Sequence, residues 1–157
     1  MMLGIDLRCL PADGSPGAGI AHAARAIAHE ICERHGDEIV LYVSSGADIG
    51  SWARQRRAPT NIVELPDTRR ASLERAIRRF PCDVLFVPSG AIPIGLPVPA
   101  IPWVHDVDIF SHPDWFPQSV FRRMLTTRMF LHGIKKAPTV FTVSEYSKRE
   151  LLKLVSY

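Results

Sequence analysis

The sequence predicts an α/β fold: a Rossmann-like, doubly wound and mostly parallel sheet in a three-layer α/β/α arrangement. Short, continuously apolar runs, typical of strands covered on both faces, alternate along the chain with segments of helical periodicity. Strands and helices that alternate through right-handed crossovers build a parallel sheet. Several of the apolar runs also end in polar or glycine-rich segments, at the edge where such sheets bind ligands.

The amino-terminal unit is predicted to be a strand, a loop and a helix. The apolar run at residues 3–7 predicts the first strand, and the Gly- and Pro-rich residues 11–19 predict the loop. A helix is expected from Ile20, because apolar residues then recur with helical spacing as far as Gly36. Glycine is a residue type that commonly ends helices.

The middle of the chain is predicted to add three strands and a helix. The strands are expected at residues 38–43, 61–65 and 82–87. A loop with a short helix around Trp52 would join the first two. Residues 68–80 have helical spacing, with apolar side chains on one face. The arginines of this helix lie largely off that face: Arg69, Arg70, Arg75, Arg78 and Arg79. They favour a solvated basic face, and a binding patch is the alternative.

A proline-rich loop is expected at residues 88–102, because so many prolines exclude a helix or a central strand. It leads into a strand at residues 101–104. The loop is unusually apolar, with Ile92, Ile94, Leu96 and Val98. We favour a satellite core beneath the loop, and the alternative is an entrance for an apolar substrate.

The carboxyl-terminal part is predicted to be a helix, a short strand and a last helix. The first helix is expected at residues 119–136, with Ser119 or Gln118 as its N-cap. A strand at 139–143 follows. Ser144 is then expected to cap a helix at residues 145–154.

Composition limits the class of protein. With 157 residues, 46% of them hydrophobic and 22% charged, the chain is typical of a soluble globular domain. The formal net charge of +3 permits anionic partners such as phosphates or a membrane surface. The three cysteines are widely spaced, and we find neither a signal peptide nor a membrane-spanning run. We therefore expect a cytoplasmic protein without a metal, a cofactor or a nucleic-acid partner.

The strongest candidate site follows the strand at residues 101–104. His105 and Asp106 stand there, at the carboxyl edge of the predicted sheet. A histidine in this place can donate to a hydroxyl group or accept a proton near neutral pH, and Asp106 can bind sugar hydroxyls. The alternatives are a histidine satisfied by the backbone and an aspartate that caps the next segment. Asp108 and His112 lie nearby, but their spacing does not favour a metal site.

The glycine loop before the first helix is a second candidate. Gly17 and Gly19 would let the N–H groups of the helix N-terminus approach an anion closely. The alternative is a turn that needs positive φ angles. The dinucleotide fingerprint would need a further glycine where His22 stands, and the loop has no Gly-Lys-Ser/Thr, so it is not a P-loop.

A third candidate is Ser144, which opens the last helix at the same sheet edge. A plain N-cap accounts for it, although the helix N-terminus would also point toward the site. A Ser-His-Asp hydrolase is the rival interpretation. No Gly-x-Ser-x-Gly segment supports that interpretation.

The motifs occur in an order that resembles one known family. They are Gly4-Ile-Asp-x-Arg8, Gly17-x-Gly19-Ile20, Val104-His105-Asp106, His112-Pro-x-x-Phe116-Pro117 and Thr142-Val-Ser144-Glu-x-Ser147-Lys-x-x-Leu151. Together they look like the N-terminal domain of a family 4, group 1 glycosyltransferase. This family has the GT-B architecture of two Rossmann domains, of which the chain would be one half.

The resemblance implies a retaining transfer of a sugar from a nucleotide-sugar donor to a glycan or lipid-linked acceptor, as in polysaccharide biosynthesis. It implies catalytic roles for His105, which would hydrogen-bond the donor sugar, and for Asp106. It also implies substrate-binding residues, which are Arg8, Gly17, Ala18, Gly19, Ile20, Ser144 and Ser147. No metal would be needed, because backbone dipoles and basic side chains would meet the charge of the leaving nucleoside diphosphate.

The family's C-terminal donor-binding domain is not among these residues, so we expect the chain to require that partner and to be inactive alone. Lipid-linked acceptors would bring the protein into peripheral contact with the inner membrane face. Two other functions stay open. One is a stand-alone Rossmann-like module that binds a nucleotide or another small molecule. The other is an interaction module that uses the arginine-rich helix at residues 68–80.

Overall fold

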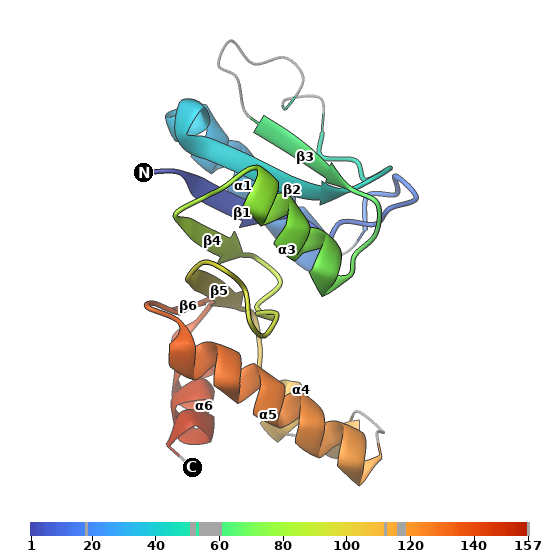
Figure 1. Ribbon diagram of the computed structural model, residues 1–157. Coiled ribbons are helices and arrows are strands. Elements are labelled where there is room, and N and C mark those ends of the chain that lie inside the picture. Colours follow the sequence, from blue (N-terminus) through green and yellow to red (C-terminus); the bar gives the residue numbers. More distant parts are fainter. Residues whose placement is uncertain (18, 51–52, 54–60, 112, 116–118, 157) are drawn as a thin grey trace.

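A six-stranded parallel sheet organises the protein. The computed structural model describes residues 1–17, 19–50, 53, 61–111, 113–115 and 119–156. Its strands follow the order β3-β2-β1-β4-β5-β6, and every neighbouring pair is parallel (Figure 1). They are β1 (Leu3–Asp6), β2 (Ile39–Ser44), β3 (Asn61–Leu65), β4 (Val84–Val87), β5 (Ala100–Val104) and β6 (Phe141–Thr142). The predicted Rossmann-like α/β fold is confirmed.

Helices follow most of the strands, as the alternating pattern predicts. They are α1 (Ile20–His35), α3 (Arg70–Arg79), α4 (Asp108–Ser111), α5 (Val120–Lys136) and α6 (Glu145–Val155), with the 3-10 turns η1 (Gly36–Glu38) and η2 (Pro113–Trp115). Ser119 caps α5 through a 3.3 Å hydrogen bond donated by the backbone N–H of Arg122. The alternative cap Gln118, and the short helix expected around Trp52, lie outside the described residues.

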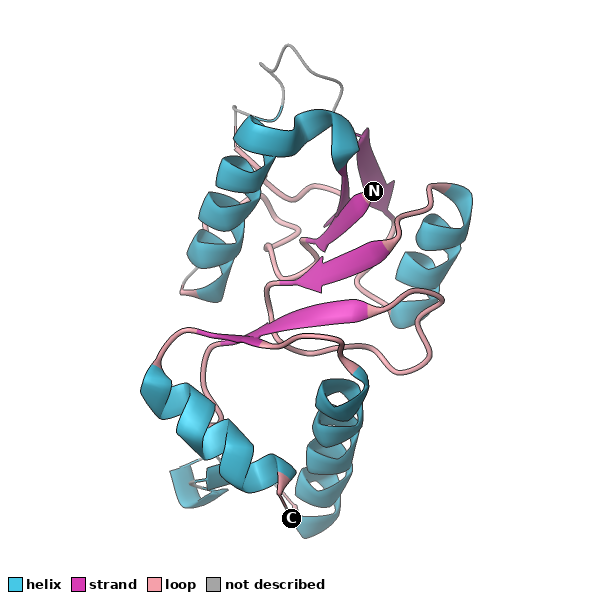
Figure 2. Ribbon diagram, turned by 90° about the vertical axis from the view of Figure 1, so that its left-hand side faces the viewer, coloured by secondary structure: helices cyan, strands magenta, loops and turns pink. Residues whose placement is uncertain are grey.

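The sheet lies between α1 on one face and α3 on the other (Figure 2). β2 is buried along its whole length, as a continuously apolar strand covered on both sides should be. The residues that α1 buries are small: Ala21, Ala24, Ala28 and Cys32. Ile20, which the sequence pattern assigns to the apolar face of α1, is instead 39% exposed. It stands in the first turn of the helix, at the edge of the buried stripe.

The second face of the sheet is covered by α3 and by the loop that follows β4. The buried residues of α3 are Ser72, Leu73, Ala76 and Ile77, and its arginines are exposed. From the loop, Ile92, Leu96 and Val98 pack against the same core. The satellite core that the sequence favours is therefore present. The predicted ranges of the loop, 88–102, and of the strand, 101–104, overlap at Pro102, and the structure has this residue within β5. There, β6 pairs only with Trp103 and Val104, so the ladder on that side begins after the proline.

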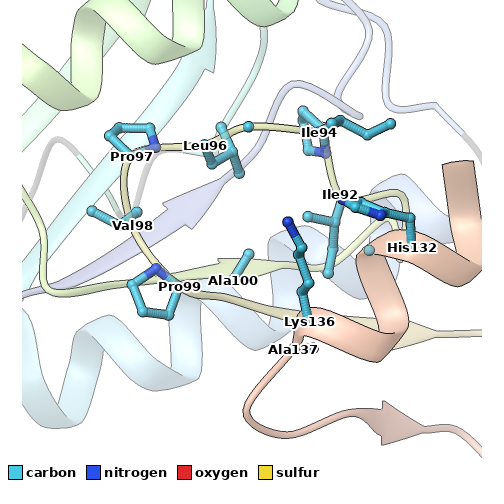
Figure 3. Close-up of a pocket in the computed structure, with 13 residues that line it drawn as sticks. Ile92, Ile94, Leu96, Pro97, Val98, Pro99, Ala100, His132, Lys136 and Ala137 are labelled. Atoms are coloured by element: carbon cyan, nitrogen blue, oxygen red, sulfur yellow. The ribbon is translucent and has the colours of Figure 1, made fainter.

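The same loop also walls a cavity of about 360 Å³ on the side of α5. Figure 3 shows Ile92, Ile94, Leu96 and Val98 around it, with His132 and Lys136 entering from the helix. The cavity is therefore lined mainly by apolar side chains and has two basic ones at one wall. The alternative interpretation of these residues, as lining for an apolar substrate, stays a prediction.

A third, smaller core joins β5 to the carboxyl-terminal helices. It contains Val104, Val107, Ile134 and Leu151, with Phe110 stacked on Phe130. Of the 17 residues of α5, only Gly133 and Ile134 are buried. Across the part of the chain that the structure describes, no helix has both the length and the apolar character to cross a membrane.

Candidate functional site

A cavity opens where the two halves of the sheet meet. The strands β1 and β4 are neighbours in the middle of the sheet, with β2 and β3 on one side and β5 and β6 on the other. Ligands of open α/β sheets bind at such a change of strand order, outside the carboxyl ends of the strands. The cavity measures about 360 Å³. It brings together Ile20 from the start of α1, Ser89 and Gly90 from the loop after β4, and His105 and Asp106 from the end of β5. A volume of this size lies at the lower end of the range found for small-molecule sites.

The outer wall of this cavity is largely apolar. It is formed by Ile109 and Phe110 of α4 and by Thr126, Met129 and Phe130 of α5. Polar groups therefore stand at the sheet edge, and apolar side chains face them from the carboxyl-terminal helices. This combination of a few polar groups in an apolar hollow is typical of sites for small organic molecules.

Two neighbours hold the side chain of His105. Its Nε2 lies 2.7 Å from the carbonyl oxygen of Pro88, and a carbonyl can only accept, so Nε2 carries the proton of this hydrogen bond. The imidazole ring also lies against Trp103, with 4.8 Å between ring centroids. In the neutral ring Nδ1 is then a lone-pair acceptor, and none of the described residues bonds to it. The side chain is thus fixed by the backbone and still keeps one free nitrogen.

Asp106 has one oxygen engaged and lines the cavity. Its Oδ1 accepts a 3.3 Å hydrogen bond from the backbone N–H of Asp108, at the start of α4. This is the capping interaction that the sequence leaves as one alternative. The residue is exposed, so its carboxylate is also open to a ligand.

Ser144 and Ser147 tie α6 to the backbone of His105. The Ser144 Oγ accepts a 3.0 Å hydrogen bond from the Ser147 N–H, which caps the helix. Ser147 is buried and donates from Oγ to the His105 carbonyl oxygen at 2.9 Å. Neither serine is among the residues that line the cavity. Their contact with the site runs through the main chain of His105, and their role in substrate binding stays a prediction.

Of the described residues of the glycine motif, Ile20 lines the cavity, whereas Gly17 and Gly19 do not. Gly17 has a φ of +67°, and a Cβ there would lie 2.7 Å from the Cβ of Ala21. Gly19 has a φ of +35° and open space around its Cβ position, and it takes the N-cap place of α1 without a side-chain cap. No acidic residue stands in the first turn, so its N–H groups remain available to an anion. Ala18 lies outside the described residues.

Arg8 is engaged with the protein itself. Its guanidinium forms a fork on Asp6, with Nε at 2.8 Å from Oδ1 and Nη2 at 2.7 Å from Oδ2. Its Nη1 donates to the carbonyl oxygen of Thr68 at 2.7 Å. Both side chains are largely buried, so the pair braces the end of β1 against the segment before α3. Arg8 does not line the cavity.

Ser89 and Gly90 are site residues that the sequence patterns do not single out. Gly90 has a φ of +74°, and a Cβ there would come within 3.0 Å of the Trp103 carbonyl oxygen. Only glycine therefore lets the loop after β4 lie this close to β5. The available signal was a Ser-Gly pair directly after a predicted strand.

Two further observations concern nucleophilic and metal chemistry in the described part of the chain. Burial, with the nearby Asp6 carboxylate, raises the pKa of the Cys9 thiol to about 11, so Cys9 is protonated at neutral pH and is a poor nucleophile. Among the described residues, no three of His, Cys, Asp and Glu lie close enough together to hold a metal ion.

No protein-family model matches the chain, and a search of curated proteins finds no similar sequence. The resemblance to glycosyltransferases therefore depends on the sequence motifs and stays a prediction.

Proposed function

We propose that the chain is the acceptor-side, N-terminal domain of a retaining glycosyltransferase. It would take part in moving a sugar from a nucleotide-sugar donor to a glycan or lipid-linked acceptor. The observation that supports this most is the cavity at the β1–β4 junction, where Ile20 of the glycine motif meets the His105-Asp106 motif. Ile20 and His105 are 85 residues apart in sequence, and both line this one cavity.

In this proposal, different residues of the chain bind different parts of the substrates. The uncapped N–H groups of α1 attract the diphosphate of the donor. The free Nδ1 of His105 accepts a hydrogen bond from a sugar hydroxyl, and the bond of Nε2 to Pro88 keeps the ring oriented. The carboxylate of Asp106 binds hydroxyl groups at the exposed side of the cavity.

In the transfer, the bond between the anomeric carbon and the phosphate oxygen breaks, and the nucleoside diphosphate leaves with the electron pair. The acceptor hydroxyl oxygen forms the new bond to that carbon, and its proton passes to an oxygen of the leaving diphosphate. In this proposal a second, donor-binding domain supplies the basic groups for the leaving diphosphate, so this chain carries one wall of the site. A lipid-linked acceptor would place the protein in peripheral contact with the cytoplasmic face of a membrane.

The test is a His105→Ala substitution in the protein that joins this chain to its donor-binding domain. We expect kcat/KM with a panel of nucleotide sugars to fall about tenfold or more, the effect of losing a substrate hydrogen bond. The matched control is His22→Ala, an exposed histidine of α1 that does not line the cavity. Unchanged turnover in His105→Ala would refute the site. A product of inverted anomeric configuration would refute the retaining reaction.

The second candidate is a stand-alone module that binds a nucleotide or another small molecule. It is favoured by the fact that the described residues of this chain form the cavity without any partner. Isothermal titration of the chain alone separates the two functions. The transferase half should bind nucleoside diphosphates and nucleotide sugars weakly or not at all. Tight binding of a nucleoside diphosphate or a dinucleotide would favour the stand-alone module.

A further inference from the structure

The loop between β4 and β5 and the end of α5 enclose a cavity that the proposed function does not use. It measures about 360 Å³ and lies beside Ala100, at the amino-terminal end of β5. His105 and Asp106 follow the other end of this strand. Of the described residues, only Ile92 lines both this cavity and the candidate site. The two cavities are therefore neighbours with different polar groups.

The wall that the loop contributes is aliphatic. Ile94 and Leu96 line the cavity together with Pro93, Pro97 and Pro99, and the described lining residues include no Phe, Tyr or Trp (Figure 3). Each proline ring fixes a backbone φ angle, so this wall has little conformational freedom to lose when a ligand binds. A hollow of this kind suits a saturated hydrocarbon group.

The loop is also held from two sides. The Arg70 side chain of α3 donates from Nη2 to the carbonyl oxygen of Gly95, at 3.4 Å. On the other side, a Cβ at Gly133 of α5 would lie 3.0 Å from the Cβ of Ile92, so the helix and the loop are in close contact. The cavity is therefore formed before any ligand enters it.

Lys136 and His132 form the wall on the side of α5. They are four residues apart, so their side chains are neighbours on one face of the helix. Figure 3 shows the Lys136 side chain extending from the helix toward the loop that surrounds the cavity. Among the described residues, neither side chain forms an ion pair, and the described lining residues include no Asp or Glu. The positive charge of Lys136 thus faces an aliphatic hollow without a counter-ion from this part of the chain.

We infer that this cavity binds a small carboxylate with an aliphatic chain. The chain lies against Ile94 and Leu96, and the carboxylate oxygens accept hydrogen bonds from the Lys136 ammonium and from an N–H of the His132 ring. Hydrogen bonds between an ammonium and a carboxylate are stronger than those between neutral groups. The single charge of a carboxylate balances one ammonium, whereas a phosphate monoester carries about −1.5 to −2 at neutral pH. The charges therefore favour the carboxylate.

The test is isothermal titration of the protein with octanoate, below the concentration at which octanoate forms micelles. We expect saturable binding. Butyrate keeps the carboxylate on a shorter chain, and 1-octanol keeps the chain length without the charge, so each should bind at least about tenfold more weakly. Octyl phosphate should bind no more tightly than octanoate. The inference would be overturned by the absence of saturable octanoate binding, by equally tight binding of 1-octanol, or by tighter binding of octyl phosphate.

Two variants test the two walls separately. Lys136→Met removes the ammonium and keeps an unbranched side chain, so the affinity for octanoate should fall about tenfold or more. Ile94→Ser removes aliphatic contact area and should lower the affinity about fivefold or more. The matched control is Lys135→Met, which changes the net charge as Lys136→Met does, at an exposed residue that does not line the cavity. Its affinity should stay within about twofold of that of the parent protein, because exposed charges away from the ligand are screened.

Circular dichroism should show the parent fold in both lysine variants, since both side chains are exposed. Equal losses of affinity in Lys135→Met and Lys136→Met would overturn the inference, and so would an unchanged affinity in Ile94→Ser.

The inference does not depend on the transferase proposal. His105 does not line this cavity, so His105→Ala should bind octanoate as the parent protein does, whatever its effect on sugar transfer. Loss of octanoate binding in His105→Ala would place the ligand in the candidate site instead and would overturn the inference.

Discussion

Helix α3 together with its N-cap Arg69 carries five Arg or Lys residues, as α5 does, but the two helices use these cations in opposite ways. In α3 and its N-cap, Arg70 and Arg78 both pair with Glu74, at 3.3 Å and 3.0 Å. Arg75 reaches the carbonyl oxygen of Ala71, and Arg79 lies over the ring of Phe80 at 5.4 Å. The apolar residues of α3 are meanwhile buried against the sheet. In α5 the cations have no ion-pair partner among the described residues, and the apolar residues Val120, Phe121, Met124 and Leu125 are exposed.

The difference shows that the number of charges does not identify a binding surface. From the sequence alone, the arginine-rich residues 68–80 are the interaction candidate, because a sequence shows charge directly but does not show which charges are paired. The structure shows which of these charged side chains already have an interaction partner within the protein. A cation that pairs with Glu74 one helical turn away contributes to the helix itself, whereas those of α5 are free to meet a partner.

The largest expected difference between the two helices concerns their apolar side chains. Leu73 of α3 is fully buried, so Leu73→Ala should lower the free energy of unfolding by about 2–5 kcal/mol. Phe121 of α5 is 70% exposed, so Phe121→Ala should change it by less than about 0.5 kcal/mol. Urea unfolding at a common m-value measures both. If Phe121→Ala lowered the free energy of unfolding by more than about 2 kcal/mol, the Phe121 side chain would have to be buried in solution. The proposed difference between α3 and α5 would then be wrong.

A smaller difference is expected at the two N-caps. Ser119 caps α5 with a side-chain hydrogen bond, and Ser119→Ala should therefore cost about 1 kcal/mol. Arg69 occupies the N-cap of α3 in extended conformation without a side-chain cap, so Arg69→Ser should stabilise the protein by up to about 1 kcal/mol. The same unfolding experiment applies. Destabilisation by Arg69→Ser would show that its side chain contributes more than the missing cap.

The smallest effect concerns the charges of α3 at low pH. Hydrogen bonds from Arg78 and the positive charge of Arg70 and Arg78 hold the pKa of Glu74 below its ordinary value in the folded protein. A carboxyl whose folded pKa is depressed stabilises the fold above its unfolded pKa, and this contribution disappears as the pH falls through the folded pKa. Melting temperatures of the parent protein and Glu74→Gln should therefore differ slightly at neutral pH and converge in acid.

Added salt provides the control for this last prediction. The gap between the parent protein and Glu74→Gln at neutral pH should shrink as salt screens the exposed pairs. A gap that persists in acid would mean that Glu74 acts through packing rather than through charge. The helix α5 has no acidic residue, so no comparable carboxyl titration can arise within it.

Local patterns predicted most of the elements correctly. The helix at Ile20, the strand Asn61–Leu65 and the cap at Ser144 each follow from a few neighbouring residues, and the structure has them at those positions. Pro102 lies within the strand predicted at residues 101–104, and the structure has it in β5, although proline is uncommon in strands. It is tolerated here since β6 pairs with β5 only beyond that residue. That pairing depends on a distant segment and cannot be read locally.

The candidate site shows the same limit. The carboxyl edge of β5 and the start of α1 could be predicted as neighbours, because parallel sheets bring these edges together. The hydrogen-bond partners of the individual groups could not be predicted from the sequence. That Nε2 of His105 meets the Pro88 carbonyl, and that Ser147 meets the His105 carbonyl, depends on the spacing between elements distant in sequence. Gly90 escaped notice because its close neighbour, Trp103, lies on another strand.

The position of β1 in the middle of the sheet also determines when the site can form during synthesis. The amide of Met2 donates to Asp83 at 2.7 Å, a contact that spans 81 residues, and β1 pairs with β4 directly beyond it. Closing so long a loop lowers the entropy of the chain before the contacts between the strands can offset that loss, so parallel pairing of this kind is slow. During synthesis, β1 therefore completes its pairing only after β4 has emerged. Because the cavity lies at that junction, a nascent chain has no site until its two halves have joined.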